Sequence, residues 1–482
     1  MKIAVIGAGV GGMTSALLLA KQGKQVTIYE KEAVVGGRLA YQGNGRYQID
    51  QGPTIILLPE MLKEILSEAG IPSSALELIS CEPLYDLHYS DGSTYTKYRD
   101  LPRQLEEIEK VFPGEGAHYL RYLSDMSEIF TIGVDSFLSK SFKTKRDFLT
   151  PENIKLLLQS RAYKSMKQFL ASYFDHSKLQ DAYALQSLYI GGSPLEAPAL
   201  YGLVSYSEHA HGIWYLKGGY AGLAAILEKA CLEQGVTIHR EAKVEEILVE
   251  QNVCKGVKVN QTTNLYDAVV FNGDFPNLPG LIPDNKHVKK KDYTPSSGCV
   301  LIYLGVTKRF PSAKTHQFFM ADSFDDHMEQ VFKTKQVPED PSFYVFNPVS
   351  IDEEAAPANE SVLYFLIPVP SGQEIDWDQI KDELVRKVID KAETALFKGL
   401  REHIVWQDIR TPADSIKDGL YQGGSFGIAP ILMQSGGFRP QVKPYKIDCL
   451  YSVGASVHPG GGVPIVMQGS RLLSQQIKKE LG

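Results

Sequence analysis

A glycine-rich turn between a short apolar strand and a helix places the strongest constraint on how this chain folds. Residues 3–6 read Ile-Ala-Val-Ile and lead directly into Gly-Ala-Gly-Val-Gly-Gly at residues 7–12. Residues 13–21 continue in a helical pattern, and residues 25–29 form a second strand that ends at Glu30. This segment predicts one βαβ unit of a parallel sheet, built on the G-x-G-x-x-G pattern of dinucleotide-binding turns.

Each glycine of this turn has its own physical role. Gly7 permits the tight turn, Gly9 lets the backbone touch a pyrophosphate, and Gly12 lets the helix pack against the strand. The exposed N–H groups and the helix dipole then hold the phosphates. Glu30 ends the second strand, where a carboxylate accepts hydrogen bonds from an adenosine ribose and repels a 2′-phosphate, so NADP is disfavoured.

The composition is that of an ordinary globular protein and excludes several classes. Its 482 residues correspond to about three compact units. Apolar residues make up 43% and charged residues 22%, which excludes a disordered or coiled-coil chain, and a net charge of −7 argues against a nucleic-acid partner. The five cysteines are scattered, and the first strand leaves no room for a secretory leader, so a cytoplasmic protein is expected.

Three runs without charged residues, 3–20, 419–438 and 449–470, have nearly the length of a membrane span. Their many glycines and prolines are typical of tight turns and close backbone approach, not of a helix that faces lipid. We therefore expect each run to be a strand–turn–helix piece, and all three to meet around one ligand. Unrelated buried strands with glycine-rich turns are the alternative.

Residues 36–38 and 50–54 favour FAD over NAD. Gly36-Gly37 lets the chain pass the same pyrophosphate a second time, and Arg38 adds a fixed cation. A β-turn and a surface charge are the alternative for these residues taken singly. The sequence contains no second glycine fingerprint that would bind a nicotinamide cofactor. We therefore expect a substrate to reduce FAD, and we expect reduced FAD to pass its electrons to oxygen or a quinone.

Glu30 followed by Gly36-Gly37-Arg38 resembles the FAD-binding signature of the family that contains amine oxidases, protoporphyrinogen oxidases and carotenoid desaturases. The C-terminal run YSVGASVHPGGGVPI at residues 451–465 resembles carotenoid desaturases specifically. Residues 50–54, 188–192 and 214–219 also have counterparts in bacterial phytoene and diapophytoene (dehydrosqualene) desaturases, and the C30 diapophytoene enzymes are the most similar group. Val457 departs from the Thr or Ala that is usual there.

This resemblance implies an α/β fold of the Rossmann type, as in glutathione reductase and amine oxidases. The FAD-binding part is expected to consist of residues 1–80, 213–288 and 406–482. A mixed α+β substrate domain is expected at 289–405, and a helical, membrane-facing region at 81–212. The residues implied to contact FAD are Gly7, Ala8, Gly9, Val10, Gly12, Glu30, Lys31, Gly37, Arg38, Gly52, Pro53, Thr54, Val244, Gly454, Val463, Pro464 and Ile465.

The resemblance also implies desaturation, in which a hydride leaves an allylic C–H bond for flavin and an adjacent proton is lost. His458 is the candidate catalytic residue, either assisting proton loss or orienting a neighbour. A histidine that only hydrogen-bonds the backbone of its turn is equally consistent. His209 and His211 alternate as on a strand, but no third ligand is near in sequence, so no metal site is expected. Residues 322–326 are expected to be a solvated loop.

A basic amphipathic stretch at residues 140–174 indicates a membrane surface. It holds eight Lys or Arg and two acidic residues, interleaved with aromatic and aliphatic side chains. In an acidic protein this pattern favours contact with anionic lipid, although a solvated helix face with a core stripe is the alternative. We expect peripheral attachment to the inner face of the cell membrane, from which a C30 or C40 polyene enters an apolar tunnel beside the flavin.

Three alternatives share this fold. The first is a carotenoid oxygenase that acts on a terminal methyl group. The second is an amine oxidase, but residues 454–465 lack the paired aromatic residues that its flavin-facing cage needs. The third is a GDI-like escort that binds lipidated partners without redox chemistry, but its flavin site is degraded, whereas Gly7, Gly9, Gly12, Glu30 and Arg38 are intact. The sequence therefore favours a desaturase.

Overall fold

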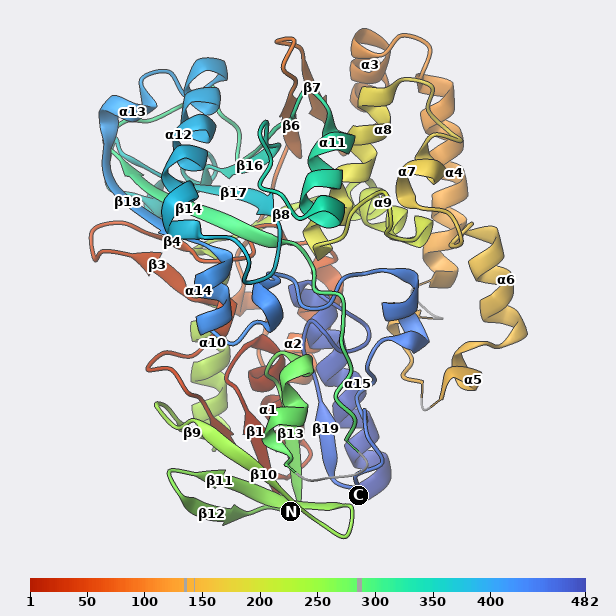
Figure 1. Cartoon of the computed structure of the whole chain (residues 1–482), viewed down its shortest axis with the longest axis vertical. Coiled ribbons are helices and arrows are strands. Elements are labelled where there is room, and N and C mark those ends of the chain that lie inside the picture. Colours follow the sequence, from red (N-terminus) through yellow and green to blue (C-terminus); the bar gives the residue numbers. More distant parts are fainter. Residues whose placement is uncertain (134–136, 143, 284–287) are drawn as a thin grey trace.

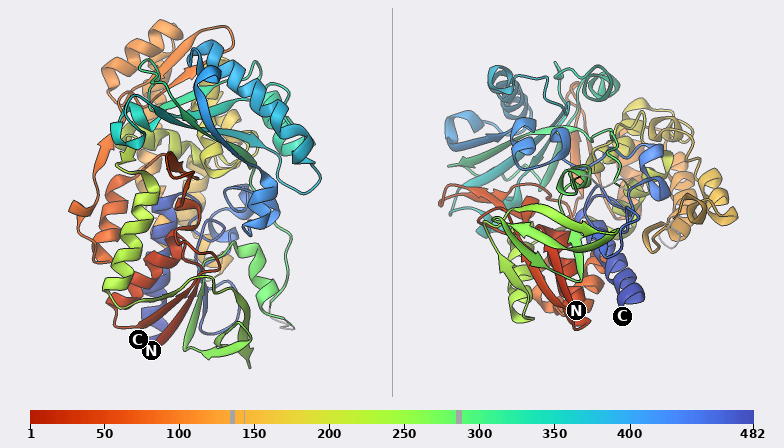
Figure 2. Two further views of the ribbon diagram at one scale, coloured as in Figure 1. Left: turned by 90° about the vertical axis from the view of Figure 1, so that its left-hand side faces the viewer. Right: turned by 60° about the horizontal axis from the view of Figure 1, so that its bottom comes forward.

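The structure is a computed structural model that describes residues 1–133, 137–142, 144–283 and 288–482. It contains a five-stranded sheet with its covering helices, a seven-stranded sheet, and a helical region beside the larger sheet (Figure 1). The first and last segments of the chain lie side by side in the part built on the five-stranded sheet (Figure 2). Lys24 and Gly482 are joined there by a hydrogen bond.

The five-stranded sheet is parallel throughout and draws its strands from distant parts of the chain. Its order is β19 (Leu450–Ser452), β13 (Ala268–Phe271), β1 (Lys2–Ile6), β2 (Gln25–Tyr29) and β9 (Thr237–His239). Ile3 pairs with Val26 on one side and with Ala268 on the other. The strands predicted at 25–29 and 268–271 are confirmed, as is the assembly of a Rossmann-type sheet from separate segments.

Alternating side chains of β1 enter two different cores. Ile3 and Val5 pack with helices on one face, whereas Ala4 and Ile6 pack on the other. The helices of the first face are α1 (Val10–Lys21), α10 (Gly219–Glu233) and α15 (Val463–Leu481), with α2 (Pro59–Glu68) against α15. The second face carries an antiparallel sheet of β10 (Val244–Glu250), β11 (Val253–Val259) and β12 (Thr262–Leu265).

The seven-stranded sheet is antiparallel except where β15 pairs with β6. Its order is β18 (Ile404–Arg410), β14 (Gly298–Val306), β17 (Ser361–Val369), β16 (Phe343–Phe346), β15 (His316–Phe319), β6 (Tyr85–His88) and β7 (Thr94–Lys97). Ile302 and Leu304 point to helix α12 (Trp377–Ala395), while Leu301 and Tyr303 point to the opposite face. The sheet therefore has one face closed by α12 and one face turned to the interior.

The helical region spans residues 101–211 and packs an aromatic core against that inner face. Its helices are α3 (Leu101–Val111), α4 (Gly116–Gly133), α5 (Lys145–Phe148), α6 (Pro151–Gln159), α7 (Met166–Leu170), α8 (Ser177–Ala184) and α9 (Gly202–His211). Tyr119, Tyr122 and Tyr183 are fully buried among them. The smaller elements are β3 (Tyr41–Gly43), β4 (Gln48–Asp50), β5 (Leu78–Ser80), β8 (Trp214–Leu216), α11 (Phe324–Glu329), α13 (Leu400–His403) and α14 (Pro412–Lys417).

Three local predictions were wrong. Residues 419–438 form loops and short 3₁₀ turns instead of strand–turn–helix, because positive φ at Gly427 and Gly436 and the missing N–H of Pro430 interrupt regular structure. His209 and His211 lie on α9, not on a strand. Residues 322–326 run into helix α11 with Phe324 buried, so they are not a solvated loop. In the described part of the chain, no helix is long and apolar enough to cross a membrane.

Candidate active site

The glycine turn joins the end of β1 to the start of α1 as predicted. Gly7 has φ +96°, and its N–H donates to the Tyr29 carbonyl oxygen at 2.8 Å. A Cβ on Gly12 would lie 2.0 Å from the Gly7 carbonyl oxygen, so only glycine fits at residue 12. No side chain caps α1. Its first N–H groups are therefore available to an anion at the positive end of the helix.

Glu30 and Lys31 follow β2 at the edge of the same turn. The Glu30 carboxylate is buried and accepts hydrogen bonds from the N–H of Ala8 at 2.7 Å and of Glu32 at 2.9 Å. Lys31 donates to the Asp418 carbonyl oxygen at 2.8 Å. Glu30 is therefore held in a fixed position beside the turn, while the ammonium group of Lys31 is already engaged by a neighbouring loop.

The second glycine pair runs alongside the first. The Gly36 N–H donates to the Ala8 carbonyl oxygen at 2.9 Å, and both Gly36 (φ +104°) and Gly37 (φ +55°) have left-handed backbone conformations. A Cβ on Gly52 would lie 2.7 Å from the Arg38 carbonyl oxygen, so the 50–54 segment also approaches closely. The two glycine-rich segments thus form one cradle, as the sequence predicts for a pyrophosphate.

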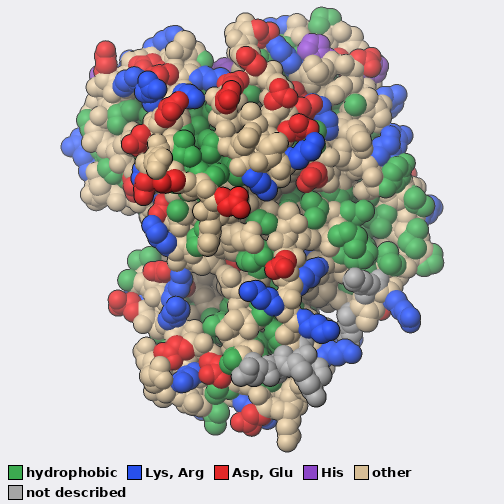
Figure 3. All heavy atoms as spheres, in the orientation of Figure 1, with side chains coloured by type: hydrophobic (Ala, Val, Ile, Leu, Met, Phe, Trp, Pro, Cys, Tyr) green, Lys and Arg blue, Asp and Glu red, His purple; other side chains and the backbone are tan. Residues whose placement is uncertain are grey.

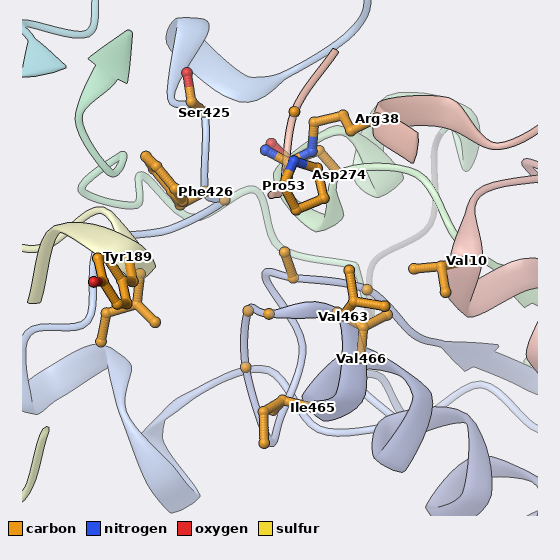
Figure 4. Close-up of a pocket in the computed structure, with 18 of the residues that line it drawn as sticks. Val10, Arg38, Pro53, Tyr189, Asp274, Ser425, Phe426, Val463, Ile465 and Val466 are labelled. Carbon is orange, nitrogen blue, oxygen red and sulfur yellow. The ribbon is translucent and has the colours of Figure 1, made fainter. Parts of the chain in front are cut away.

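Arg38 supplies an uncommitted positive charge to this cradle. Its side chain faces the cavity (Figure 4), and it forms no hydrogen bond or ion pair with any residue that the structure describes. Burial lowers the pKa of the guanidinium, and the negative charge of Asp274 opposes that effect. An unpaired arginine in the interior is typical of a site for a phosphate or another anion.

The C-terminal segment completes the cradle from the other side. β19 leads through Gly454, with φ +135°, into a turn and then into α15, which begins at Val463. The Ser470 hydroxyl on α15 donates to the Gly11 carbonyl oxygen at 2.9 Å, which fixes α15 beside α1. The strand–turn–helix arrangement predicted at 449–470 is confirmed, and the two ends of the chain build one site.

All these segments line one cavity of about 1220 Å³. This exceeds the roughly 300–1,000 Å³ of common small-molecule pockets, so a cofactor and a substrate can share it. The predicted residues that line it are Gly7, Gly9, Val10, Glu30, Lys31, Gly37, Arg38, Gly52, Pro53, Thr54, Val244, Gly454, His458, Val463, Pro464 and Ile465. Ala8 and Gly12 are absent from its lining and support the turn from behind.

The other half of the cavity is apolar. The inner face of the seven-stranded sheet contributes Leu301, Phe318, Tyr344, Tyr364 and Leu366, and the helical region contributes Phe130, Leu157, Leu185, Leu188, Tyr189 and Leu203. Figure 4 shows Tyr189 across the cavity from Val10 and Arg38. An apolar chamber therefore continues directly from the glycine cradle, in agreement with the tunnel expected beside the flavin.

Several lining residues were missed by sequence reasoning. Asn272 and Asp274 follow β13, where the end of a predicted parallel strand could have indicated them. Arg439 is buried and donates to the carbonyl oxygens of Gln434 at 3.0 Å and Ala455 at 2.6 Å. It lies in a loop without a recognisable motif, and only the folded chain brings it to the cavity.

His458 is buried at the same cavity. Its Nε2 lies 2.8 Å from the Lys140 carbonyl oxygen, so Nε2 carries the proton and Nδ1 is the acceptor. Nδ1 is enclosed and has no partner among the described residues. Burial lowers the pKa of the imidazole to about 4. His458 is therefore neutral near pH 7, and one of its nitrogens is committed to the backbone.

Residues 140–174 divide into core and surface. The buried apolar side chains described in this stretch are Phe142, Phe148, Leu156, Ala162, Met166, Phe169, Leu170, Tyr173 and Phe174. Leu149, Ile154, Leu158 and Tyr163 are 43–66% exposed, and Figure 3 shows apolar side chains gathered over α6. Lys167 pairs with Asp181 and Asp325, so it is not a free surface charge. Lys143 lies outside the described residues.

No group of three His, Cys, Asp or Glu residues suited to a metal ion occurs in the ranges that the structure describes. The cradle instead offers free helix N–H groups, glycines that admit a close ligand, and an unpaired arginine, which fit the phosphates of FAD. Fold and site together define a flavin-dependent oxidoreductase with an apolar substrate chamber.

Comparison with known proteins identifies the family. The profile of the family described as flavin containing amine oxidoreductase matches residues 10–477, and the chain belongs to this family. It is 50% identical, over 99% of its length and 97% of the relative, to 4,4′-diapolycopen-4-al dehydrogenase of Metabacillus indicus. It is 32% identical, over 100% of its length and 99% of the relative, to 4,4′-diapophytoene desaturase of Staphylococcus aureus.

Within the family, these two similarities place the chain among the carotenoid desaturases and related dehydrogenases, and FAD is its cofactor. Cyclohexylamine oxidase of Brevibacterium oxydans has the same fold, with a TM-score of 0.65 at 14% identity and coverage of 100% and 99% of the two chains. The fold, the cofactor and the desaturase family predicted from the sequence are therefore confirmed.

Proposed function

We propose that this protein is an FAD-dependent desaturase that introduces double bonds into a C30 polyene in carotenoid biosynthesis. The observation that carries the proposal is the single cavity, in which a dinucleotide cradle opens directly into an apolar chamber. The S. aureus relative is named for a C30 substrate of this kind. The two relatives are named as a desaturase and a dehydrogenase, which favours this function over a GDI-like escort and over a terminal-methyl oxygenase.

In this proposal the cradle residues hold FAD and the chamber orients the polyene. Bound FAD supplies the hydride acceptor for an allylic C–H bond. Gly9, Arg38 and the first turns of α1 and α15 bind the pyrophosphate, and Glu30 binds the ribose. Pro53, Thr54 and the segment 463–465 border the flavin. The aromatic and aliphatic wall excludes water from the reacting carbons. Oxygen or a quinone is the proposed acceptor of the electrons.

His458 has an orienting role in this proposal. Its Nε2 is committed to the Lys140 carbonyl oxygen and its Nδ1 is enclosed, so this residue supports the C-terminal turn and does not take the substrate proton. The hydrogen bond from Nε2 to the Lys140 carbonyl ties that turn to the segment that leads to α6.

A bilayer-facing surface around α6 is the proposed entrance for the polyene. Phe148, Leu157 and Ala162 line the cavity, and the exposed Leu158 and Tyr163 lie next to them in the chain. Lys140, Arg146 and Lys155 are exposed in the same stretch and suit anionic lipid. We propose peripheral attachment to the cytoplasmic face of the membrane.

Co-sedimentation with anionic liposomes tests this attachment. Leu158→Glu is expected to reduce binding, because it places a charge at the proposed apolar contact. Leu265→Glu is the matched control, since Leu265 is 71% exposed on β12. Equal binding of the two variants would contradict the proposed surface.

The second candidate function is oxidation of a C30 aldehyde. It is favoured by the 50% identity to a relative named for that reaction. The two functions give different products, because desaturation removes two hydrogen atoms and lengthens conjugation, whereas aldehyde oxidation adds one oxygen atom from water.

The deciding experiment mixes the purified, FAD-loaded protein without oxygen with either 4,4′-diapophytoene or 4,4′-diapolycopen-4-al. Flavin bleaching reports reduction, and mass spectrometry identifies the product. Bleaching by the hydrocarbon with loss of two hydrogen atoms supports the desaturase. Bleaching by the aldehyde alone supports the second candidate, and bleaching by neither contradicts both. A Gly12→Ala variant without flavin is the control.

A further inference from the structure

A chain of hydrogen bonds leads from the cavity wall into the core of the seven-stranded sheet. Thr54 Oγ1 lies 2.8 Å from the Tyr344 hydroxyl, and that hydroxyl lies 2.6 Å from His316 Nδ1. His316 Nε2 lies 3.6 Å from the Cys81 sulfur. All four side chains are buried. These hydrogen bonds join residues that are far apart in the sequence, so no local motif indicates them.

The strand register produces this contact. His316 pairs with Phe346 and Phe318 pairs with Tyr344, so His316 and Tyr344 are diagonal neighbours on the antiparallel strands β15 and β16. Their rings are stacked with centroids 5.9 Å apart, and His316 is also stacked on Phe346 at 5.5 Å. The imidazole is therefore fixed in position by two aromatic neighbours as well as by its hydrogen bonds.

The direction of the hydrogen bonds follows from the chemistry of the groups. Burial lowers the pKa of His316 to about 3, so the imidazole is neutral. Burial also raises the pKa of Tyr344 well above its ordinary value, so the phenol keeps its proton. The Tyr344 O–H donates to Nδ1, and the Nε2–H of the neutral ring points to the Cys81 sulfur. One of the two lone pairs of the phenol oxygen accepts from Thr54, and the other has no hydrogen-bond partner among the described residues.

Tyr344 is the member that meets the reaction space. Both Tyr344 and Thr54 line the cavity, and Thr54 follows Pro53 in the segment that borders the proposed flavin position. His316 and Cys81 are absent from the cavity lining and lie behind Tyr344. The phenol of Tyr344 therefore links the cavity to His316.

We propose that Tyr344 accepts the proton that the polyene loses, while its own proton passes to His316. The inference rests on the proposed function, in which a hydride and a proton leave adjacent carbons. After the hydride has left, the neighbouring C–H bond breaks and its electron pair becomes the new C=C bond. The proton binds the Tyr344 oxygen, and the phenol proton moves to His316 Nδ1.

A weak base is sufficient for this step. Loss of the hydride leaves an allylic cation, whose adjacent C–H is a very strong acid, so even an imidazole of low pKa accepts the proton favourably. The same low pKa makes the imidazolium return its proton through Tyr344 when the product leaves. Tyr344 is thus a catalytic residue, and His316 is a positioning residue that acts through it.

The experiment measures the reductive half-reaction of the FAD-loaded enzyme by stopped-flow bleaching of the flavin with 4,4′-diapophytoene. Tyr344→Phe is expected to slow bleaching by about 10²–10⁴-fold, the usual contribution of a general base. His316→Gln is expected to slow it comparably, because the amide oxygen accepts the phenol hydrogen bond but takes no proton. A structural role would be rescued by this glutamine.

Two matched controls remove a similar group outside the cavity lining. Tyr173→Phe deletes a phenol hydroxyl that donates to the Asp125 carboxylate at 2.6 Å. His327→Gln replaces a buried histidine whose Nδ1 accepts from the Ser342 N–H at 3.0 Å. Both controls are expected to bleach at the wild-type rate. Flavin absorbance shows that each variant retains FAD.

Replacement of Tyr344 by a fluorinated tyrosine keeps the shape and changes only the acidity of the phenol. A change in bleaching rate, with a solvent isotope effect that Tyr344→Phe abolishes, supports the relay. Wild-type rates in the fluorinated, Tyr344→Phe and His316→Gln enzymes would overturn it. Failure of the wild-type enzyme to bleach with the hydrocarbon would instead contradict the proposed desaturation, so the two failures are distinct.

Discussion

Lys97 and Glu208 form an ion pair in the interior, and removal of one partner is expected to destabilise the helical region strongly. Lys97 Nζ lies 2.7 Å from Glu208 Oε2, with side-chain exposures of 2% and 0%. Oε2 also accepts from the Tyr85 hydroxyl at 2.8 Å and from Gln186 at 3.1 Å. The pair joins β7 to α9, and the ammonium group lies 4.2 Å from the centre of the Tyr183 ring.

Lys97→Met leaves the Glu208 carboxylate buried without its cation. Such a loss costs about 3–5 kcal/mol, which corresponds to a factor of roughly 10²–10⁴ in the local opening equilibrium. Lys97→Met combined with Glu208→Gln removes both charges and is expected to recover most of that loss, because neutral side chains need no compensating charge in the interior.

Hydrogen exchange of peptides from α9 measures this opening directly. We expect protection to fall by at least a hundredfold in the single variant and by much less in the double variant. Lys110→Met is the control, since Lys110 pairs with Glu107 at 2.9 Å but its side chain is 70% exposed. A loss below about tenfold in Lys97→Met, or an equal loss in the double variant, would refute this account.

Three further predictions concern the cavity. Gly12→Ala is expected to lower the amount of bound FAD by at least about tenfold, because the new Cβ would overlap the Gly7 carbonyl oxygen. Flavin absorbance at constant protein concentration measures the bound FAD. Gly280→Ala is the control, because its new Cβ would meet no neighbour within 4 Å. Arg38→Met is expected to weaken FAD binding about 10- to 100-fold through loss of a charged hydrogen-bond donor, whereas the exposed Arg103→Met is expected to change nothing in the same titration. The pKa of His458 is about 4 in the folded protein, below its unfolded value of 6.5. Its titration therefore does not change the free energy of unfolding above pH 6.5. As the pH falls from 6.5 to 4, the unfolded state binds a proton that the folded state does not, so the folded state loses stability. Urea titrations are therefore expected to show that His458→Gln loses about 3 kcal/mol less unfolding free energy than the wild type over this pH range. An equal loss in the two proteins would contradict the burial of a neutral imidazole at residue 458.

Local sequence was sufficient for the cofactor cradle because its requirements are local. A strand, a glycine turn and a helix must follow one another within about thirty residues, and an added Cβ at Gly12 or Gly52 is excluded by short contacts. The C-terminal turn before Val463 was predicted for the same reason. The division into five segments, from 1–80 to 406–482, and the site roles of single residues stay predictions.

The sequence by itself determined the two glycine-rich segments of the cradle, because the backbone conformations needed there are open to few residues. Tertiary structure alone decided the apolar chamber, the burial of Lys97 with Glu208, and the hydrogen bonds that join Thr54, Tyr344 and His316. These depend on the pairing of strands and helices that lie tens to hundreds of residues apart. Hydrophobic periodicity does not specify which distant partner a strand selects, and that selection places the groups that can move a proton.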